Sequence, residues 1–324
     1  MVEAALKVQD LRTHFFGRTS INKAVDGISY EVGRGEIMAI VGESGCGKTV
    51  GALSLIQLNP PGSRILGGRV LWKDRDLLKM DRNEISHIRG KEISMVFQEP
   101  LTALNPIQTI GRQIAEVFQI HEGLQGKEAE REAIKMLDAV AMPDAEKRAK
   151  AFPFQLSGGM RQRAMIAMSL SCKPALLIAD EPTTAVDVTI QAQLLELITS
   201  LAREIKTTVI LITHNLGIVA RYAVKIIIMY AGKIVEKGET EELYAHPRHP
   251  YTISLLKAVP RLDQESKQKL ITIEGQPPPL DHRLPAGCSF HPRCSFAGEI
   301  CKKENPPLRH LSGKHEVSCW SVEE

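Results

Sequence analysis

The chain lacks several features that would each place it in a definite class of protein. No apolar run approaches the roughly 18 residues that a membrane-spanning helix needs, and residues 1–5 lack the basic and apolar regions of a signal peptide. We therefore expect the protein to stay in the cytosol. The net charge is only +3, from 41 basic and 38 acidic residues, and no long block carries one sign. This balance argues against a nucleic-acid-binding protein that relies on bulk charge.

The six cysteines are not expected to form a disulfide framework in the cytosol, and they are unevenly distributed. Cys46 and Cys172 are isolated, whereas the other four lie close to the end of the chain: Cys288, Cys294, Cys301 and Cys319. Zinc sites favour pairs separated by two to four residues, but these four are separated by five, six and seventeen residues. A cubic iron–sulfur cluster tolerates irregular spacing. The spacing leaves open a zinc site, an iron–sulfur cluster or four free structural cysteines.

One segment matches a phosphate-binding pattern at every fixed position. The residues Gly42-Glu43-Ser44-Gly45-Cys46-Gly47-Lys48-Thr49 fit G-x-x-x-x-G-K-[ST], between an apolar run at 37–41 and a helix-like run at 50–55. The glycines would let successive N–H groups point at phosphates, and the helix start would add its positive dipole end. Lys48 would then reach the β- and γ-phosphates, and the Thr49 hydroxyl would bind Mg²⁺. The flanks disfavour the alternative, a glycine-rich turn that binds nothing.

Chemical groups follow two later apolar runs, where buried strands are expected to end. Asp180 and Glu181 come directly after residues 175–179, and His214 follows residues 208–213. Phosphate-loop ATPases place a magnesium ligand at the carboxyl end of such a strand. Adjacent acids point to opposite faces of a strand, so we expect Asp180 to face Mg²⁺ and Glu181 to face an attacking water. A lone histidine at a strand end usually caps it, but the groups already expected at this sheet edge favour a functional His214.

Two further features have a functional and an ordinary interpretation. Ser157, followed by Gly158 and Gly159, predicts a helix start with uncovered N–H groups, which would make a second anion site without a lysine. Taken alone, an ordinary helix cap is the simpler interpretation. Phe15 and Phe16, which we expect in a turn before the phosphate loop, suit either stacking on a purine base or packing in the core.

The patterns divide the chain into an α/β domain over residues 1–240 and an extension over residues 241–324. Period-two alternation at the start predicts antiparallel strands, and helical periodicity from about 107 onward predicts a helical subdomain over about residues 100–165. Beyond residue 241 the composition shifts to histidine, proline and cysteine, so we expect a small irregular appendage. We expect its basic residues to offset the charge of the thiolates: Arg283, His291, Arg293, Lys302 and Lys303.

Together these pieces resemble the ATP-binding subunit of an ABC (ATP-binding cassette) transporter over about residues 5–240. The resemblance rests on six motifs in the expected order: the phosphate loop, Gln98 after a strand, Leu156-Ser157-Gly158-Gly159, Asp180-Glu181, Thr184-Ala185-Val186-Asp187 and His214. It implies a phosphate-loop ATPase core of the RecA-like class, with an antiparallel β subdomain and a helical insertion. It also implies ATP and Mg²⁺ as ligands.

The resemblance implies roles for residues of the chain's own ATP site. Phe15, in preference to Phe16, would stack on adenine. Gln98 would sense the γ-phosphate and Mg²⁺ and would link to a membrane subunit. Asp180 would hold Mg²⁺, Glu181 would be the base for water, and His214 would contact the γ-phosphate.

A second set of residues would serve ATP held by another cassette. Ser157, Gly158 and Gly159 would bind its γ-phosphate, and Asp187 would lie at the interface. Met160 departs from the glutamine that many relatives have, but this change leaves Ser157 and the glycine amides in place.

The extension resembles that of oligopeptide/dipeptide importer ATPases, through His249-Pro250-Tyr251-Thr252, the triple proline at 277–279 and the four cysteines. This resemblance implies a peripheral protein at the cytoplasmic face of the membrane. Its partners would be two integral permease subunits, a second ATPase subunit that is a different chain, and indirectly an external solute-binding protein, with no nucleic acid. It favours a 4Fe-4S cluster on the cysteines, with zinc as the alternative. Rival functions are an importer ATPase for nickel or sugar, an exporter ATPase and a soluble ABC ATPase.

Overall fold

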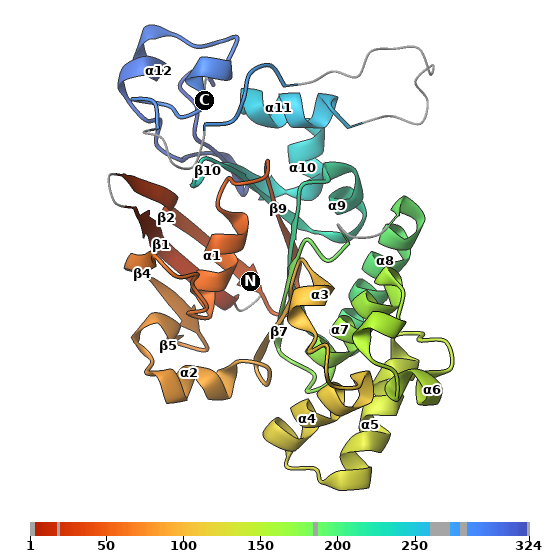
Figure 1. Ribbon diagram of the computed structural model, residues 1–324. Coiled ribbons are helices and arrows are strands. Elements are labelled where there is room, and N and C mark those ends of the chain that lie inside the picture. Colours follow the sequence, from red (N-terminus) through yellow and green to blue (C-terminus); the bar gives the residue numbers. More distant parts are fainter. Residues whose placement is uncertain (1–3, 18–19, 184–186, 260–272, 279–283, 323–324) are drawn as a thin grey trace. The chain divides into compact units, whose positions relative to one another are not determined.

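The computed structural model describes residues 4–17, 20–183, 187–259, 273–278 and 284–322, and it divides into two compact units (Figure 1). The first unit holds Met1–Ala5, Gly33–Glu36 and Lys79–Ile212. The second unit holds Leu6–Val32, Ile37–Leu78 and Thr213–Glu324.

Three parallel strands form the sheet of the first unit. They are β6 (Ile93–Val96), β7 (Leu176–Asp180) and β8 (Thr208–Thr213), paired in the order β6-β7-β8. Nearly every residue in them is buried, as their continuous apolar runs predict for a sheet covered on both faces. Because the strands are parallel, their carboxyl ends meet at one edge of the sheet, which brings residues after β6 and β7 together.

Helices make up most of the rest of the first unit, as the helical periodicity predicts (Figure 1). On α4 and α5, apolar side chains at helical spacing are buried and the two helices pack together. Gly123, with a φ of 72°, ends α4 in the left-handed conformation that glycine adopts at little cost. The elements are α2 (Arg82–Ile88), α3 (Pro100–Ala103), α4 (Ile110–Glu122), α5 (Gly126–Ala139), α6 (Ala145–Ala149), η2 (Pro153–Gln155), α7 (Gly158–Leu170) and α8 (Val188–Glu204).

An antiparallel sheet opens the second unit. Its strand order is β2-β1-β4-β5, made by β1 (Ala4–Phe16), β2 (Ile21–Gly33), β4 (Ser63–Trp72) and β5 (Arg75–Asp76). The helix α1 (Lys48–Leu55) contacts β2 through Gly51, beside Val25 and Ile28. The expectation that Phe15 and Phe16 lie in a turn is wrong, since both lie in β1 and Phe15 pairs with Ser63. Two adjacent aromatics fit a strand as well as a turn flank.

A second sheet of this unit contains strands of both the α/β domain and the extension. The strands β3 (Ile37–Val41) and β9 (Lys225–Tyr230) are parallel, and β10 (Lys233–Glu239) pairs with β9. On the far side of β10 lie β12 (His315–Val317) and β11 (Arg309–Ser312). The predicted irregular appendage therefore contains two short strands that continue the core sheet. Strands of three and four residues are too short to give a periodicity from which to predict them.

Short helices complete the second unit: η1 (Leu77–Lys79), α9 (Leu216–Tyr222), α10 (Thr240–Ala245), α11 (Pro250–Lys257), η3 (His291–Arg293) and α12 (Glu299–Lys303). Within the described ranges, no helix is long and apolar enough to cross a membrane.

Candidate functional site

The phosphate loop connects β3 to α1 and is shaped by two glycines that other residues cannot replace. Gly47 precedes α1 with a φ of 104°, and a Cβ atom there would lie 2.0 Å from the carbonyl oxygen of Ala24. A Cβ atom on Gly42 would lie 2.3 Å from the carbonyl oxygen of Met229. Since contacts this short do not occur between real atoms, the backbone approaches its neighbours too closely for any side chain.

Lys48 is folded back over this loop. Its Nζ donates to the carbonyl oxygens of Gly42, at 2.8 Å, and Glu43, at 3.0 Å, and the residue is 5% exposed. These two hydrogen bonds hold the ammonium group of Lys48 against the main chain of the loop. Cys46 is also buried here, and burial raises the pKa of its thiol, so it remains a protonated packing group.

In the first unit, the structure brings Gln98 and Glu181 together at the edge where β6 and β7 end. Gln98 Nε2 donates to Glu181 Oε2 at 3.0 Å. Asp180 and Glu181 are 2% and 9% exposed. Glu181 has a φ of 44°, which is uncommon for a residue other than glycine, and its N–H donates to the carbonyl oxygen of Ile212 at 2.9 Å. This left-handed conformation ends the regular strand geometry of β7 directly after Asp180.

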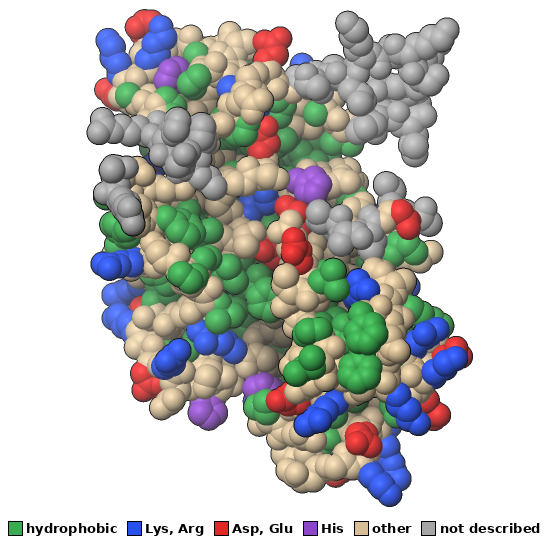
Figure 2. Space-filling view, in the orientation of Figure 1, with side chains coloured by type: hydrophobic (Ala, Val, Ile, Leu, Met, Phe, Trp, Pro, Cys, Tyr) green, Lys and Arg blue, Asp and Glu red, His purple; other side chains and the backbone are tan. Residues whose placement is uncertain are grey.

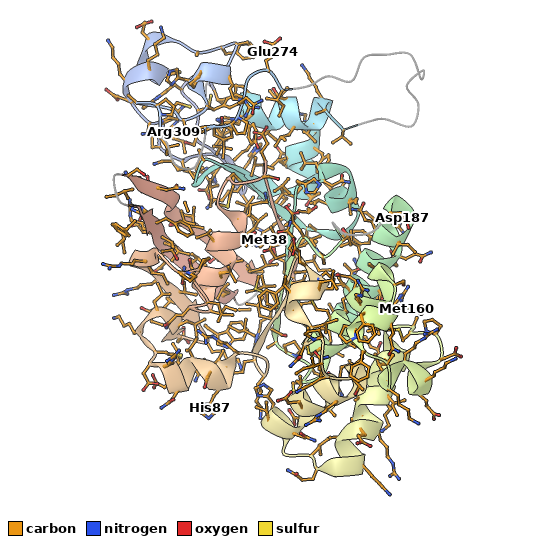
Figure 3. The ribbon with its side chains drawn as sticks, viewed as in Figure 1. Met38, His87, Met160, Asp187, Glu274 and Arg309 are labelled. Carbon is orange, nitrogen blue, oxygen red and sulfur yellow. The ribbon has the colours of Figure 1, made fainter. Side chains whose placement is uncertain are left out.

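Two helix starts of the first unit carry the remaining predicted residues (Figure 3). Ser157 Oγ accepts from the N–H of Met160 at 3.3 Å and caps α7, which begins at Gly158, as the sequence pattern predicts. Asp187 Oδ1 accepts from the N–H of Ile190 at 3.0 Å, in the first turn of α8. Gly159 lies close to Ile190, with 3.4 Å between a built Cβ and Ile190 Cγ2. The two helix starts are therefore neighbours. Residues 184–186 of the predicted turn lie outside the described residues.

The other predicted residues belong to the second unit. Thr49 is in the first turn of α1, and Ser44 and Gly45 lie in the loop before it. His214 follows β8 and is exposed, and Phe15 is half-buried near the end of β1. Phe16 is 39% exposed, and the guanidinium of Arg64 lies 5.5 Å from its ring centre. The assembly of these residues with Gln98, Asp180 and Glu181 around one nucleotide stays a prediction.

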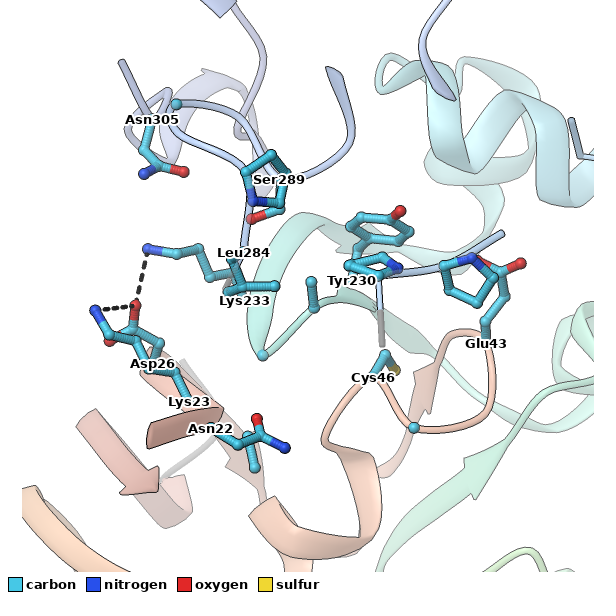
Figure 4. A pocket seen from close by; sticks show the side chains of 18 of the residues that line it. Asn22, Lys23, Asp26, Glu43, Cys46, Tyr230, Lys233, Leu284, Ser289 and Asn305 are labelled. Atoms are coloured by element: carbon cyan, nitrogen blue, oxygen red, sulfur yellow. Dashed lines mark ion pairs between the residues drawn. The ribbon is translucent and has the colours of Figure 1, made fainter. Parts of the chain in front are cut away.

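A cavity of about 570 Å³ lies beside the phosphate loop, within the second unit (Figure 4). Ser44, Gly45 and Cys46 line one side, and residues 284–287 of the extension line another. Its size is within the range of small-molecule sites. Sequence reasoning missed that the extension forms a wall of this cavity, because nothing in the sequence relates residues about 240 positions apart.

Asp26 forms ion pairs with three basic side chains at this cavity. Its carboxylate lies 3.3 Å from Lys233 Nζ, 3.9 Å from Lys23 Nζ and 3.0 Å from Arg12 Nη1. Burial alone would raise the pKa of Asp26, but these positive charges outweigh it and lower the pKa below the ordinary value. Asp26 is therefore ionised at neutral pH and fixes two lysines at the cavity wall.

The four cysteines of the extension line one small cavity of about 10 Å³. His249, His291 and Trp320 lie around them. None of the six cysteines forms a disulfide. Burial raises the pKa of three of the thiols, Cys288, Cys294 and Cys319. In the described ranges, no group of three or more His, Cys, Asp or Glu side chains is arranged so that it could hold a metal ion.

The role expected for Arg293 needs correction. We expected this residue to offset the charge of the thiolates, but its guanidinium forms an ion pair with Glu43 of the phosphate loop, at 2.6 Å. The pattern that defines the loop leaves position 43 open, so this contact could not be predicted from the motif.

Both parts of the chain match models of known families. Residues 25–184 match the ABC transporter family, and residues 235–301 match the oligopeptide/dipeptide transporter C-terminal region. The probable peptide ABC transporter ATP-binding protein y4tR of Sinorhizobium fredii is 47% identical over 320 residues, which cover 98% of this chain and 95% of the relative. The chain belongs to the ABC transporter family of ATP-binding proteins. The predicted family and fold class are thus confirmed.

Other members of this ABC family match at similar levels. The oligopeptide transport ATP-binding protein OppD of Salmonella typhimurium is 47% identical, with 98% of this chain and 94% of the relative covered. The dipeptide transport ATP-binding protein DppD of Bacillus subtilis is 46% identical, with 98% and 95% covered. Among solved structures, the dimeric ATP-binding cassette MJ0796 bound to ADP and Pi has a TM-score of 0.66 and 25% identity, over 72% of this chain and 98% of that chain.

Proposed function

We propose that this chain is the ATP-hydrolysing subunit of an ABC importer for dipeptides or oligopeptides. The observation that carries the proposal is the match of the extension to the oligopeptide/dipeptide transporter C-terminal region, on the same chain as a complete phosphate loop. The relatives named above align over almost their whole length, and their names refer to peptide transport.

ATP hydrolysis requires positioning and charge stabilisation more than covalent chemistry. The loop amides and Lys48 would neutralise the phosphates, while Thr49, Asp180 and Gln98 would hold Mg²⁺, which would stabilise the negative charge of the transition state. Glu181 would orient and deprotonate the attacking water. The hydrogen bond from Gln98 to Glu181 supports this assignment, because it fixes the carboxylate and couples it to the residue that would sense the γ-phosphate. His214 would contact the γ-phosphate, and Phe15 would stack on adenine.

A Glu181→Gln variant tests the catalytic assignment. The amide keeps the shape of the side chain but cannot act as a base, so ATP binding should persist while turnover falls by about 10²-fold or more. Turnover close to that of the unmodified protein would remove Glu181 from this role. The matched control is Glu204→Gln, an exposed acid at the end of α8, which should leave turnover unchanged.

Ser157, Gly158, Gly159 and Asp187 support a dimeric arrangement of cassettes. Neighbouring helix starts at α7 and α8 offer an anion site without a lysine, which suits the γ-phosphate of ATP held by another chain. We infer that this second ATPase subunit is a different chain. The isolated protein should then be a weak ATPase. Rapid hydrolysis by a demonstrated monomer, independent of protein concentration, would contradict this inference.

The segment after Gln98 has the surface expected for contact with membrane subunits. Three apolar side chains in or near this segment are unusually exposed: Leu101 (61%), Ile107 (83%) and Phe154 (67%). Hydrophobic side chains gather over these helical elements of the first unit in Figure 2. Gln113 braces the segment, because its side chain accepts from the N–H of Asn105 and donates to the carbonyl oxygens of Asn105 and Gln108.

A braced apolar surface of this kind suits a protein partner. We propose two integral permease subunits there, which would hold the chain at the cytoplasmic face of the membrane, and an external solute-binding protein that acts through them. The proposal includes no nucleic-acid partner. Reconstitution with these subunits and measurement of solute-stimulated ATP hydrolysis tests the function, with a peptide, nickel and a sugar as separate solutes. Stimulation by nickel or sugar alone would replace the peptide assignment.

For the cysteines we propose a 4Fe-4S cluster held by Cys288, Cys294, Cys301 and Cys319. The proposal is supported by the four cysteines lining a single cavity, and thiolates are the ligands of such clusters. The cavity of about 10 Å³ is smaller than a cluster, so the four side chains would have to move apart to hold one. When bound, the cluster would supply a structural crosslink. Protein purified without oxygen should be brown and contain iron and sulfide. Colourless protein with one equivalent of zinc would replace the cluster by zinc, and metal-free protein would remove both.

A further inference from the structure

The extension contacts Glu43 of the phosphate loop through both the side chain and the main chain of this residue. Arg293 Nη1 and Nη2 donate to the two carboxylate oxygens of Glu43, at 2.6 and 3.0 Å. The Glu43 N–H donates to the hydroxyl of Tyr251 at 2.9 Å. A paired fork of this kind fixes orientation as well as distance. Glu43 is thus held from two elements of the extension.

Arg293 and Tyr251 are themselves rigidly held. The Arg293 side chain is 5% exposed, and its Nε donates to the carbonyl oxygen of Glu274 at 3.0 Å. The rings of Tyr230 and Phe290 lie 5.8 and 5.9 Å from its guanidinium carbon. Tyr251 is fully buried and packs edge-on against Tyr230, with ring centres 4.7 Å apart. Groups that are fixed before the ligand arrives lose little entropy when they act on it.

The charge of Glu43 gives this contact a consequence for an anionic ligand. Glu43 lies one residue after Gly42, in a loop whose amides would face phosphates. An unpaired carboxylate at this position would repel a nucleotide, because the two negative charges would share a partly desolvated site. Arg293 pairs with both oxygens of this carboxylate and so neutralises its charge.

We infer that the extension positions the phosphate loop, with Arg293 and Tyr251 as positioning residues that act on nucleotide affinity through Glu43. The inference rests on the proposed ATP-binding function of the loop. It gives the extension a direct role in the ATPase cycle. Arg293 also lies directly before Cys294, so the residue that holds the loop and one of the four cysteines are neighbours in the chain.

The test measures binding of a non-hydrolysable ATP analogue with Mg²⁺ to the full chain, by calorimetry. Arg293→Gln should weaken binding about tenfold, because the variant loses a charge-assisted pair and leaves Glu43 unpaired. Tyr251→Phe, which removes only the hydroxyl, should weaken binding about threefold. In the reconstituted assembly, Arg293→Gln should raise KM for ATP and change kcat by less than about twofold, since Arg293 does not touch the reacting atoms.

A double variant separates positioning from general stability. Glu43→Gln removes the repelling charge, so Arg293→Gln combined with Glu43→Gln should regain binding to within about threefold of the unmodified protein. Equally weak binding by the single and double variants would show that Arg293 merely stabilises the fold, and it would overturn the inference.

Arg309→Gln is the matched control. Arg309 donates to the carbonyl oxygens of Cys319 and Val322 within the extension, at 2.6 and 3.2 Å. The substitution should lower the melting temperature and leave nucleotide affinity unchanged. Failure of the unmodified chain to bind the analogue would refute the proposed function, whereas normal binding by Arg293→Gln would refute this inference alone.

Discussion

We predict that Glu236→Gln destabilises the second unit by about 3 kcal/mol, although the substitution changes only one atom. Glu236 lies in β10 and is fully buried. Its Oε1 accepts from the N–H of Arg248 at 2.7 Å and from His315 Nε2 at 2.8 Å, and its Oε2 accepts from the N–H of His249 at 3.0 Å. The carboxylate therefore joins the core sheet to the start of α11 and to β12.

The magnitude follows from the number of donors that meet this side chain. A glutamine has one acceptor oxygen, and its best orientation keeps that oxygen near Arg248 and His315. Its amide nitrogen then faces the N–H of His249, so one buried donor loses its partner, which costs about 1–3 kcal/mol. The two remaining hydrogen bonds lose their ionic character, at about 0.5–1 kcal/mol each.

Urea unfolding followed by tryptophan fluorescence measures the effect, because Trp320 lies in the extension and its Nε1 donates to the carbonyl oxygen of Glu304. The matched control is Glu239→Gln on the same strand. Glu239 pairs with Lys314 at 2.9 Å, but the two side chains are 57% and 65% exposed, so its loss should cost under about 0.5 kcal/mol. Equal effects of the two substitutions would refute the network described for Glu236.

Two further predictions concern Gly47 and Cys172. Gly47→Ala should lower the free energy of unfolding by at least about 3 kcal/mol, because the added Cβ would clash with the carbonyl oxygen of Ala24. The control Gly62→Ala, also at positive φ but with no neighbour within 4 Å, should lower it by about 1 kcal/mol. Equal losses in thermal unfolding would contradict this reasoning. Burial, with a smaller contribution from Glu122, raises the pKa of Cys172 to about 11, so less thiolate is present at pH 8 than in an ordinary cysteine and alkylation should keep accelerating up to about pH 11. A plateau near pH 9, seen by mass spectrometry of the Cys172 peptide, would contradict the assigned pKa.

The parallel core strands could be predicted because burial on both faces leaves a distinctive pattern. Residues 176–180 and 208–212 are almost continuously apolar, and only a strand covered on both sides needs such a run. The acids at the end of β7, Asp180 and Glu181, were predictable for a related reason. In a parallel sheet, strand ends collect at one edge, so a polar residue directly after an apolar run lies near other such residues. The bond between Gln98 and Glu181 joins residues placed by this rule.

The extension could not be predicted in the same way, because its order comes from single long-range contacts. The strands β11 and β12 are too short for periodicity, and β12 exists because β10 offers a free edge and Glu236 accepts from His315. Arg293 illustrates the same limit. Nearness in sequence to Cys294 suggested that it balances thiolate charge, but a folded guanidinium pairs with the carboxylate it can reach in space. A charge pattern read along the chain cannot distinguish these two partners.

Residues of the phosphate loop have two different roles, and the difference has a physical origin. Fixed positions of the motif act through the main chain and Lys48, so any chain that binds phosphate must satisfy them, and sequence alone reveals them. The motif places no requirement on the side chain at position 43, so this residue can instead bind whatever packs beside the loop. Here that neighbour is the extension, and the hydroxyl of Tyr251 and the fork of Arg293 meet the amide and carboxylate of the same residue. An acid is tolerable so close to phosphates only if a buried cation neutralises it. Glu43 in the loop therefore depends on Arg293 in the extension. In a chain without the extension, replacing Glu43 by a neutral residue should raise the affinity of the loop for nucleotide.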